Sequence, residues 1–283
     1  MKILTPVVLS ILLFSSSQLF GQTEAYERAL NDKTATIDLH YFENEPMFYK
    51  AGETFKGIEV EILNRFSNWM KNEKGINLTY NYVEHQEFND LYEAVKSNQG
   101  NHIGAGTVTR TEDRAIELDF SAPYLRNVSV LVSSSKLKTA RNAEQLKELL
   151  SSTQAYTVKG SVHEQHLAAL FKEYEVEPKI IYLSDPKAVF DKINESPRYI
   201  GYVDVITFWK YIKTAEKPVK MHKVANSTDE YFGFIFPRGS GWAYEFNEFF
   251  ESGFGYTSTK EYHKMLEKYL SFEILKSVEL SPY

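Results

Sequence analysis

The chain has 283 residues, a formal net charge of −6 and no cysteine. An acidic chain offers no electrostatic footprint for nucleic acid, and a chain without cysteine forms no disulfides and cannot be a cysteine-anchored lipoprotein. Its length allows two compact domains or one large one, and its 19 tyrosines and 19 phenylalanines argue against disorder.

The N-terminus has the layout of a secretory signal peptide. Lys2 precedes an apolar run from Ile3 to Phe14, and a polar stretch follows up to Gln22. The apolar run has about a dozen residues, against the roughly 20 that a membrane-spanning helix needs, so a retained anchor is the weaker interpretation. We expect residues 1–22 to be a cleaved signal peptide and the mature protein to be exported and soluble.

Strand-like and helix-like runs alternate along the chain, which is the order typical of α/β architecture with largely parallel sheets. The elements of a first block are predicted in this order: strand 36–41, helix 57–70, strand 78–83, helix 88–97 and strand 102–107. The helix over 57–70 is amphipathic, with Ile58, Ile62 and Phe66 on one face.

A second block with the same alternation begins at Val128. Its predicted elements are strand 128–135, helix 143–150, strand 155–158, helix 163–174, strand 180–183, helix 187–195 and strand 199–203. The tail then carries a strand over 231–236, a turn over 237–240, and helical periodicity over 245–250 and 260–270.

The tail is too small to bury its own apolar faces, so we expect it to dock on the first block. The sequence therefore predicts a discontinuous first lobe of residues 23–127 and 229–283 and a second lobe of residues 128–228. Two chain crossings would connect the lobes and leave a cleft between them, and ligand sites favour such clefts.

The most distinctive stretch of the sequence runs from Gly104 to Tyr124 and reads GAGTVTRTEDRAIELDFSAPY. It combines a Thr-x-Thr, an arginine and an Asp-Phe-Ser-x-Pro-Tyr. It resembles the bacterial extracellular solute-binding proteins of family 3, whose polar-amino-acid members carry these features in this order. The segments 46–61, 232–240 and 253–269 are similar to further blocks of the family, also in family order.

The resemblance implies a two-lobed periplasmic-binding-protein fold of type II, in which Thr107, Thr109 and Arg114 bind the carboxylate of an amino-acid-like ligand. An arginine presents a planar fork that can bind a carboxylate through two parallel hydrogen bonds. Without the motif, Arg114 would be interpreted as a helix-surface arginine that pairs with Glu112 or Glu117, worth about 0 to 1 kcal/mol. The motif favours the ligand role.

Asp204 follows the predicted strand 199–203 and stands where the family places the acid that receives the ligand's ammonium group. A carboxylate at the carboxyl end of a strand, facing a cleft, suits a cation. The structural alternative is an N-cap for a helix that begins near Ile206, and both roles can hold in part.

Ser161 corresponds to a short Gly-Ser/Thr loop of the family, where N–H groups and a hydroxyl can add donors to the carboxylate. Its alternative is simple N-capping of the helix predicted over 163–174. Lys159 can either reach an acidic or amide side chain of the ligand or remain a solvated lysine.

Tyr41, Asn44 and Phe88 fall where relatives place residues that cover the aliphatic part of the ligand. A flat aromatic side chain there would contribute apolar burial and a cation–π attraction to the ammonium, whereas core packing is the alternative for Phe88. Met47 stands at a position that is commonly aromatic in the family, which leaves the side chain of the ligand open.

Other chemistry has little support in the sequence. His163 and His166 are three residues apart, whereas a His-Glu-x-x-His zinc helix needs four, so we predict no metal site and no cofactor. The chain is predicted to be a monomeric periplasmic binding protein that delivers its ligand to an ABC permease, and not an enzyme. A ligand sensor and a cyclohexadienyl-dehydratase-like enzyme are the alternatives on the same scaffold.

Overall fold

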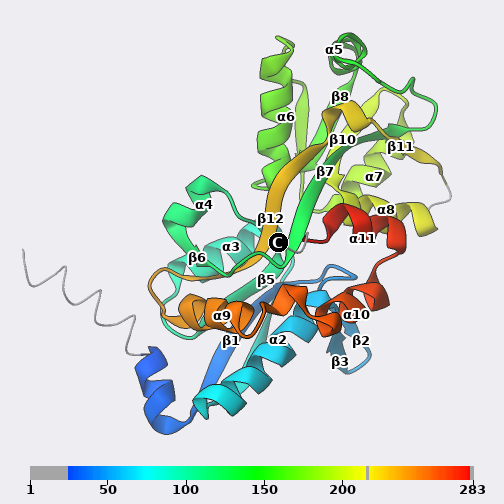
Figure 1. Ribbon diagram of the computed structural model, residues 1–283. Helices are drawn as coiled ribbons and strands as arrows, with labels where there is room; N and C mark the ends of the chain where they lie inside the picture. Colours follow the sequence, from blue (N-terminus) through cyan, green and yellow to red (C-terminus); the bar gives the residue numbers. More distant parts are fainter. Residues whose placement is uncertain (1–24, 215–216, 281–283) are drawn as a thin grey trace, which may run out of the picture. The chain divides into compact units, whose positions relative to one another are not determined.

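The computed structural model describes residues 25–214 and 217–280 (Figure 1). The signal peptide predicted over residues 1–22 lies outside the described residues. The chain divides into two compact units. Over the described residues, unit 1 comprises residues 25–85, Leu91–Ala122 and Phe234–Tyr262, and unit 2 comprises Gln86–Asp90, 123–214, 217–233 and 263–280. Each unit is described by itself.

Unit 1 is built on three neighbouring parallel strands, in the order β4 (Asn77–His85), β1 (Thr34–Phe42) and β5 (His102–Thr109). The end of β12 (Ser227–Pro237) lies next to β5, and β6 (Leu118–Phe120) pairs antiparallel with β12. A short hairpin of β2 (Tyr49–Ala51) and β3 (Thr54–Lys56) stands apart from these strands.

The helices of unit 1 begin with a segment over residues 25–32. The others are α2 (Ile58–Trp69), which continues as the π-helix η1 (Met70–Lys74), most of α3 (Phe88–Ser97), α4 (Glu112–Glu117), α9 (Trp242–Glu251), η3 (Tyr256–Ser258) and the start of α10 (Lys260–Tyr269). Aromatic side chains hold α2 against α9, since the ring centroids of Phe66 and Phe246 are 4.2 Å apart. Phe234 of β12 joins the same cluster at 4.9 Å from Phe246.

A row of three histidines crosses the parallel strands of unit 1. Nδ1 of His40 lies 2.9 Å from Nε2 of His85, and Nε2 of His40 lies 3.0 Å from Nδ1 of His102. Burial, together with the two neighbouring imidazoles, lowers the pKa of His40 to about 4. The His40 ring is therefore neutral near pH 7.

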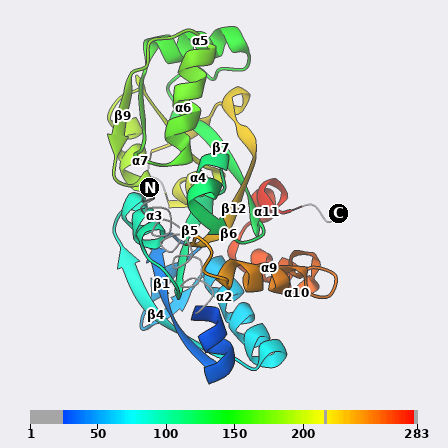
Figure 2. The same ribbon diagram turned by 90° about the vertical axis from the view of Figure 1, so that its left-hand side faces the viewer.

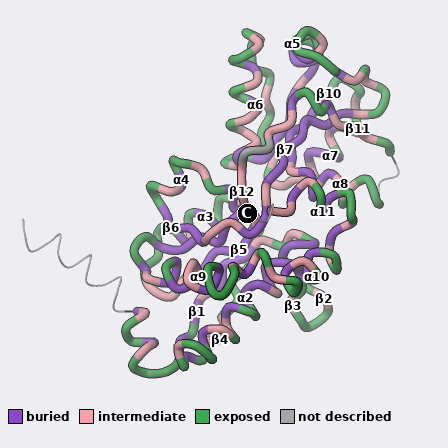
Figure 3. The backbone as a smooth tube through the Cα atoms, in the orientation of Figure 1, coloured by how far each residue is buried: buried purple, intermediate pink, exposed green. Residues whose placement is uncertain are grey.

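Unit 2 has a mixed sheet. Its strands follow the order β12, β7 (Leu125–Ser134), β10 (Tyr199–Asp204), β8 (Gln154–Val158) and β9 (Ile180–Leu183), and β11 (Val219–Met221) also pairs with β7. The pairs β10–β8 and β8–β9 are parallel, whereas β7 is antiparallel to β10, β11 and β12. Figure 3 shows buried residues along β7 and β10, as expected for central strands.

The helices of unit 2 start at residues that suit a helix N-terminus. They are α5 (Ala143–Ser152), α6 (Val162–Glu173), α7 (Pro186–Glu195), α8 (Val205–Thr214) and α11 (Phe272–Val278), with η2 (Lys223–Ala225) as a short 3-10 turn. Asn142 caps α5 by accepting from the N–H of Gln145 at 3.0 Å, and Asp185 caps α7, which has Pro186 in its first turn. Figure 2 shows α6 and α7 beside the strands, and both contact β8 and β10.

His222 is a buried residue of unit 2 beside β7. Its exposed fraction is 0%, its Nδ1 accepts from the N–H of Ala140 at 3.0 Å, and its Nε2 lies 2.8 Å from the hydroxyl of Ser133. Burial lowers the pKa of His222 to about 4. The ring is a neutral structural link, with Nε2 as the donor to Ser133.

The alternation of strands and helices follows the sequence prediction, with differences at short elements. The prediction did not include α4, the β2–β3 hairpin, β6, β11 or α11, all of which have ten residues or fewer. Within the described part of the tail, residues 263–280 cluster with unit 2, where α11 contacts β7 and α8.

Candidate functional site

The residues expected to bind a carboxylate lie together in unit 1, on β5 and α4. Thr109 is 3% exposed at the end of β5, and Arg114 is 7% exposed in α4. Nη1 of Arg114 donates to the backbone oxygen of Thr109 at 2.9 Å, and its guanidinium carbon lies 5.5 Å from the centroid of the Tyr92 ring. Arg114 is therefore a buried guanidinium, held over an aromatic face, and not an exposed surface arginine.

Thr111, which the sequence analysis did not select, sets the position of Arg114. It is the N-cap of α4, and its hydroxyl accepts from the N–H of Arg114 at 3.2 Å. Glu112 and Asp113 follow in the first turn, where acids are favourable. A threonine followed by two acids is the usual pattern of a helix start, so this signal was present in the sequence.

Thr107 has an unusual backbone. Its φ is +52°, in the left-handed region that β-branched residues rarely adopt. Its hydroxyl donates to the backbone oxygen of Gly106 at 2.7 Å and lies 3.4 Å from Nδ2 of Asn44. Asn44 in turn forms a backbone bridge with Phe48. The structure thus brings the side chains of Asn44 and Thr107 into contact.

Tyr41 lies in an aromatic cluster rather than in an open pocket. It is 2% exposed, stacks on Phe48 at 4.7 Å between ring centroids, and donates its hydroxyl to Glu84 at 3.0 Å. Burial and this hydrogen bond raise the pKa of Tyr41 to about 12. Its observed contacts are those of a core residue beside the segment that carries Asn44.

Asp204 ends β10 in unit 2 and caps α8. Its Oδ1 accepts from the N–H of Thr207 at 2.8 Å, and its Oδ2 accepts from the hydroxyl of Thr207 at 2.6 Å. Burial raises the pKa of Asp204, and the hydrogen bonds from Thr207 oppose this shift. The capping alternative is therefore present, and both carboxylate oxygens already have a donor.

Ser161 precedes α6 but does not cap it through its side chain. Its hydroxyl donates instead to the backbone oxygen of Val158 at 2.6 Å, and the neighbouring Gly160 has a φ of +72°. The N–H of Gly160 donates to Glu164 at 2.8 Å. A tight turn between β8 and α6 results, and simple side-chain capping does not describe the contacts of Ser161.

Phe88 and Lys159 line one hollow of about 270 Å³ in unit 2. Phe88 is half-buried, and Lys159 is exposed. The other lining residues come from the segment before α3, from the β8–α6 turn and from the end of β9: Glu87, Asn89, Gly160, Glu164, Leu183 and Ser184. Polar groups predominate, so a ligand group held here would be polar or charged.

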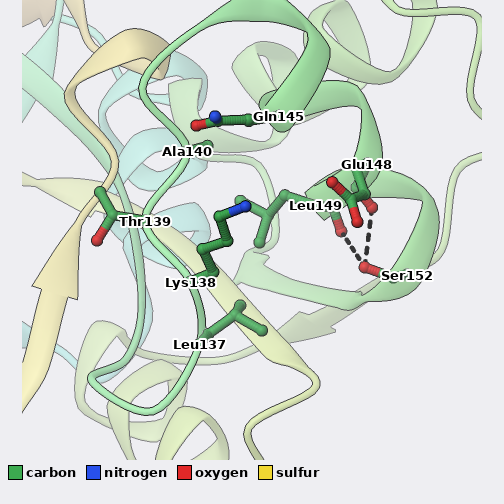
Figure 4. A pocket seen from close by; sticks show the side chains of 8 residues that line it. All are labelled: Leu137, Lys138, Thr139, Ala140, Gln145, Glu148, Leu149 and Ser152. Atoms are coloured by element: carbon green, nitrogen blue, oxygen red, sulfur yellow. Dashed lines mark hydrogen bonds between the residues drawn. The ribbon is translucent and has the colours of Figure 1, made fainter.

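A second, smaller hollow of about 110 Å³ lies between the loop 137–140 and α5 (Figure 4). Lys138 and Glu148 are among its lining residues, and none of the candidate ligand residues reaches it. The hydroxyl of Ser152 is bonded to the backbone of α5, at 2.8 Å from the oxygen of Glu148.

His166 has a carboxylate partner. Its Nε2 lies 2.7 Å from Oε1 of Glu230. Among residues 25–214 and 217–280, no group of three or more histidines, cysteines and acids is arranged to hold a metal ion. Over the same residues, every helix is too short or too polar to cross a bilayer.

Comparison with solved structures identifies the fold. An ancestral arginine-binding protein bound to arginine matches with a TM-score of 0.67 at 19% identity, over 83% of this chain and 98% of its own. The arginine-, lysine-, histidine-binding protein ArtJ from Geobacillus stearothermophilus matches with a TM-score of 0.66 at 16% identity, over 86% of this chain and 100% of its own. The chain therefore has the α/β fold of the two-lobed periplasmic amino-acid-binding proteins, which confirms the predicted fold class.

A third similar structure is named as the precursor of an enzyme. The ancestral amino acid-binding protein AncCDT-1, a precursor of cyclohexadienyl dehydratase, matches with a TM-score of 0.62 at 17% identity, over 89% of this chain and 98% of its own. No curated protein matches the sequence. The sequence model of the bacterial extracellular solute-binding proteins, family 3, matches residues 41–272. The chain belongs to this family, as its motifs predicted.

Proposed function

We propose that this protein captures a small amino-acid-like ligand in the periplasm and delivers it to an ABC importer. Solute binding is the common role of the family, and the relatives described above are binding proteins for amino acids. The observation that carries the proposal is the buried guanidinium of Arg114, held beside Thr109 and over the Tyr92 ring, because such a planar fork can bind a carboxylate through two parallel hydrogen bonds.

In this proposal the two units supply different parts of the recognition. Thr107, Thr109 and Arg114 of unit 1 bind the carboxylate, and Asp204 of unit 2 receives the ammonium group. Ser161 adds a hydroxyl, and Tyr41, Asn44 and Phe88 cover the aliphatic part of the ligand. Lys159 reaches the side chain of an acidic or amide ligand and stays in solvent with a cationic one. Simultaneous contact with both units would favour a closed state of the two lobes over an open one.

A thermal-shift screen of residues 23–283 against the common amino acids tests the proposal. L-arginine, L-lysine and L-histidine are the first candidates, since a similar structure is named for binding all three. A ligand at 100 times its dissociation constant stabilises a protein by about 2.7 kcal/mol, which a melting curve resolves. We expect at least one amino acid to raise the melting temperature.

The matched variants are Arg114→Ala and Arg65→Ala. Arg65 also belongs to unit 1 but is exposed and pairs with Glu261 on the surface at 3.0 Å. Arg114→Ala is expected to abolish the ligand-induced shift, while Arg65→Ala keeps it. An unchanged shift in Arg114→Ala would show that the carboxylate is bound elsewhere.

An enzymatic use of the same fold is the second candidate, and the match to AncCDT-1 is the observation that favours it. We propose a binding protein without turnover. Incubation with a cyclic carboxylate substrate of cyclohexadienyl dehydratase, followed by product analysis, separates the two. Catalytic turnover that Arg114→Ala removes would replace the binding-only proposal with an enzyme. A ligand sensor would instead bind an amino acid without supporting its uptake.

A further inference from the structure

Glu59 of α2 is a buried carboxylate that contacts the backbone next to the candidate ligand residues. Its exposed fraction is 0%. One of its oxygens, Oε1, accepts from the N–H of Gly106 at 3.2 Å and from the N–H of Thr107 at 2.9 Å. Hydrogen bonds from N–H groups to a carboxylate are about twice as strong as neutral ones. Two successive amides of β5 are therefore held on one charged atom.

The start of α2 fixes Glu59 in this place. Gly57 has a φ of +128°, and a Cβ atom there would lie 2.1 Å from the backbone oxygen of Met47. This close approach lets the oxygens of Pro46 and Met47 accept the first N–H groups of the helix, from Ile58 at 3.1 Å and from Glu59 at 3.0 Å. Those N–H groups would otherwise lack partners within the helix. The segment 46–47 thus anchors the helix turn that carries the carboxylate.

The backbone that Glu59 holds is the strained one. A β-branched residue at positive φ persists only where its surroundings over-determine it, and Thr107 has a φ of +52°. The bonds to Glu59 supply such a constraint. Thr107 also lies 3.4 Å from Nδ2 of Asn44, so the segment before α2 reaches the same place from its other side.

We propose that Glu59 is the positioning residue for the carboxylate-binding half of the site in unit 1. It does not touch the ligand. Its carboxylate holds the backbone N–H groups of Gly106 and Thr107 in place. This fixes Thr107 and, two residues later, Thr109, whose backbone oxygen accepts the hydrogen bond from Arg114. Its effect on binding rests on the proposed function, whereas its effect on the β5 backbone does not.

Amide hydrogen exchange in the ligand-free protein tests the structural step. The variant is Glu59→Gln, which keeps the shape of the side chain but removes the charge. The matched control is Glu245→Gln, since Glu245 is also buried in unit 1, at 4% exposed, and pairs with Lys74 at 3.2 Å, away from β5. We expect exchange of the Gly106 and Thr107 amides, followed by NMR, to become about tenfold faster or more in Glu59→Gln and to stay unchanged in Glu245→Gln.

Binding of L-arginine, measured by calorimetry on the same three proteins, tests the consequence. Glu59→Gln is expected to weaken the affinity by about tenfold or more, equivalent to about 1.4 kcal/mol. Glu245→Gln is expected to lower the melting temperature without changing the affinity. If the amides of Gly106 and Thr107 exchange at the wild-type rate in Glu59→Gln, or if they exchange faster while the affinity stays at its wild-type value, the positioning role is wrong.

The two proposals fail separately. If wild-type protein binds neither L-arginine nor any other amino acid, the proposed function fails, and the exchange rates alone decide whether Glu59 holds the backbone of Thr107. If another amino acid binds, it replaces L-arginine as the probe with the same expected loss.

Discussion

Arg114 in unit 1 and Asp204 in unit 2 both lie in the first turn or at the start of a helix that follows a strand, but they are supported differently. In unit 1 the helix cap is Thr111, and Arg114 is a separate residue whose N–H the cap accepts. In unit 2 the candidate ligand group is itself the cap, because both oxygens of Asp204 accept from Thr207.

This difference determines whether a substitution can separate helix stability from ligand recognition. In unit 1, helix stability and ligand recognition belong to different side chains, so each can be removed alone. In unit 2, removal of Asp204 removes both at once, and only a side chain that caps without a charge separates them. Asparagine is such a side chain, because it is among the best N-caps and is neutral.

The largest effect is expected from Asp204. Asp204→Ala and Asp204→Asn should both weaken amino-acid binding by about 100-fold or more, because a buried ammonium that loses its partner costs several kcal/mol. Only Asp204→Ala should also lose about 1 kcal/mol of stability through the missing cap. Calorimetric affinities and denaturant unfolding measure the two effects. Wild-type affinity in Asp204→Asn would mean that Asp204 is a cap and nothing more.

A smaller effect is expected from pH. Burial raises the pKa of Asp204 above its ordinary value of 3.8. An ammonium ligand binds the ionised form, so affinity should be constant above the raised pKa and fall by up to about tenfold per pH unit below it. The fall should begin at a higher pH than for an ordinary aspartate.

Ionisation of Asp204 should favour ligand binding but lower the stability of the ligand-free protein. A carboxyl with a raised folded pKa stabilises the fold most at pH values below its unfolded pKa, and the contribution is lost as the pH rises through the folded pKa. Affinities of wild type and Asp204→Asn across the acidic range test the statement on binding, and unfolding free energies of the same two ligand-free proteins test the statement on stability. A parallel decline in the two proteins would assign the pH dependence to other groups.

The smallest effect is expected from the cap in unit 1. Thr111→Ala removes the acceptor of the Arg114 N–H and should cost about 1 kcal/mol of unfolding free energy, while Thr111→Ser should restore most of it. Because Arg114 keeps its bond to Thr109, affinity should fall less than in Asp204→Asn. An affinity loss as large as that of Asp204→Asn would show that Thr111 itself contacts the ligand.

The sequence predicted the α/β alternation because that pattern is local and repeated. The helix over 57–70 and the strand over 102–107 were both expected from periodicity, and both are present within a few residues. The short helix α4 was not expected, because one and a half turns contain too few residues to show a period. Helix α11, with seven residues, was not predicted for the same reason.

The family motif grouped Thr107, Thr109 and Arg114 as candidate carboxylate ligands, and in the structure Arg114 donates to the backbone oxygen of Thr109. Glu59 could not be found this way, since it is 47 residues from Gly106 and no local pattern relates a helix acid to distant amides. The positive φ of Thr107 could not be predicted from the sequence either, because the left-handed conformation is usually occupied by glycine and a threonine does not indicate it.

The histidine row of unit 1 sets a limit on how many protons that part of the sheet can hold. Each of its two N···N contacts, at 2.9 and 3.0 Å, requires one hydrogen. Three neutral imidazoles carry three hydrogens, which fill both contacts and one outer nitrogen. A fourth hydrogen fits on the other outer nitrogen, but a fifth would place two hydrogens in one contact and push the rings apart. The row thus accommodates a single added charge, and a second would break one of its two contacts.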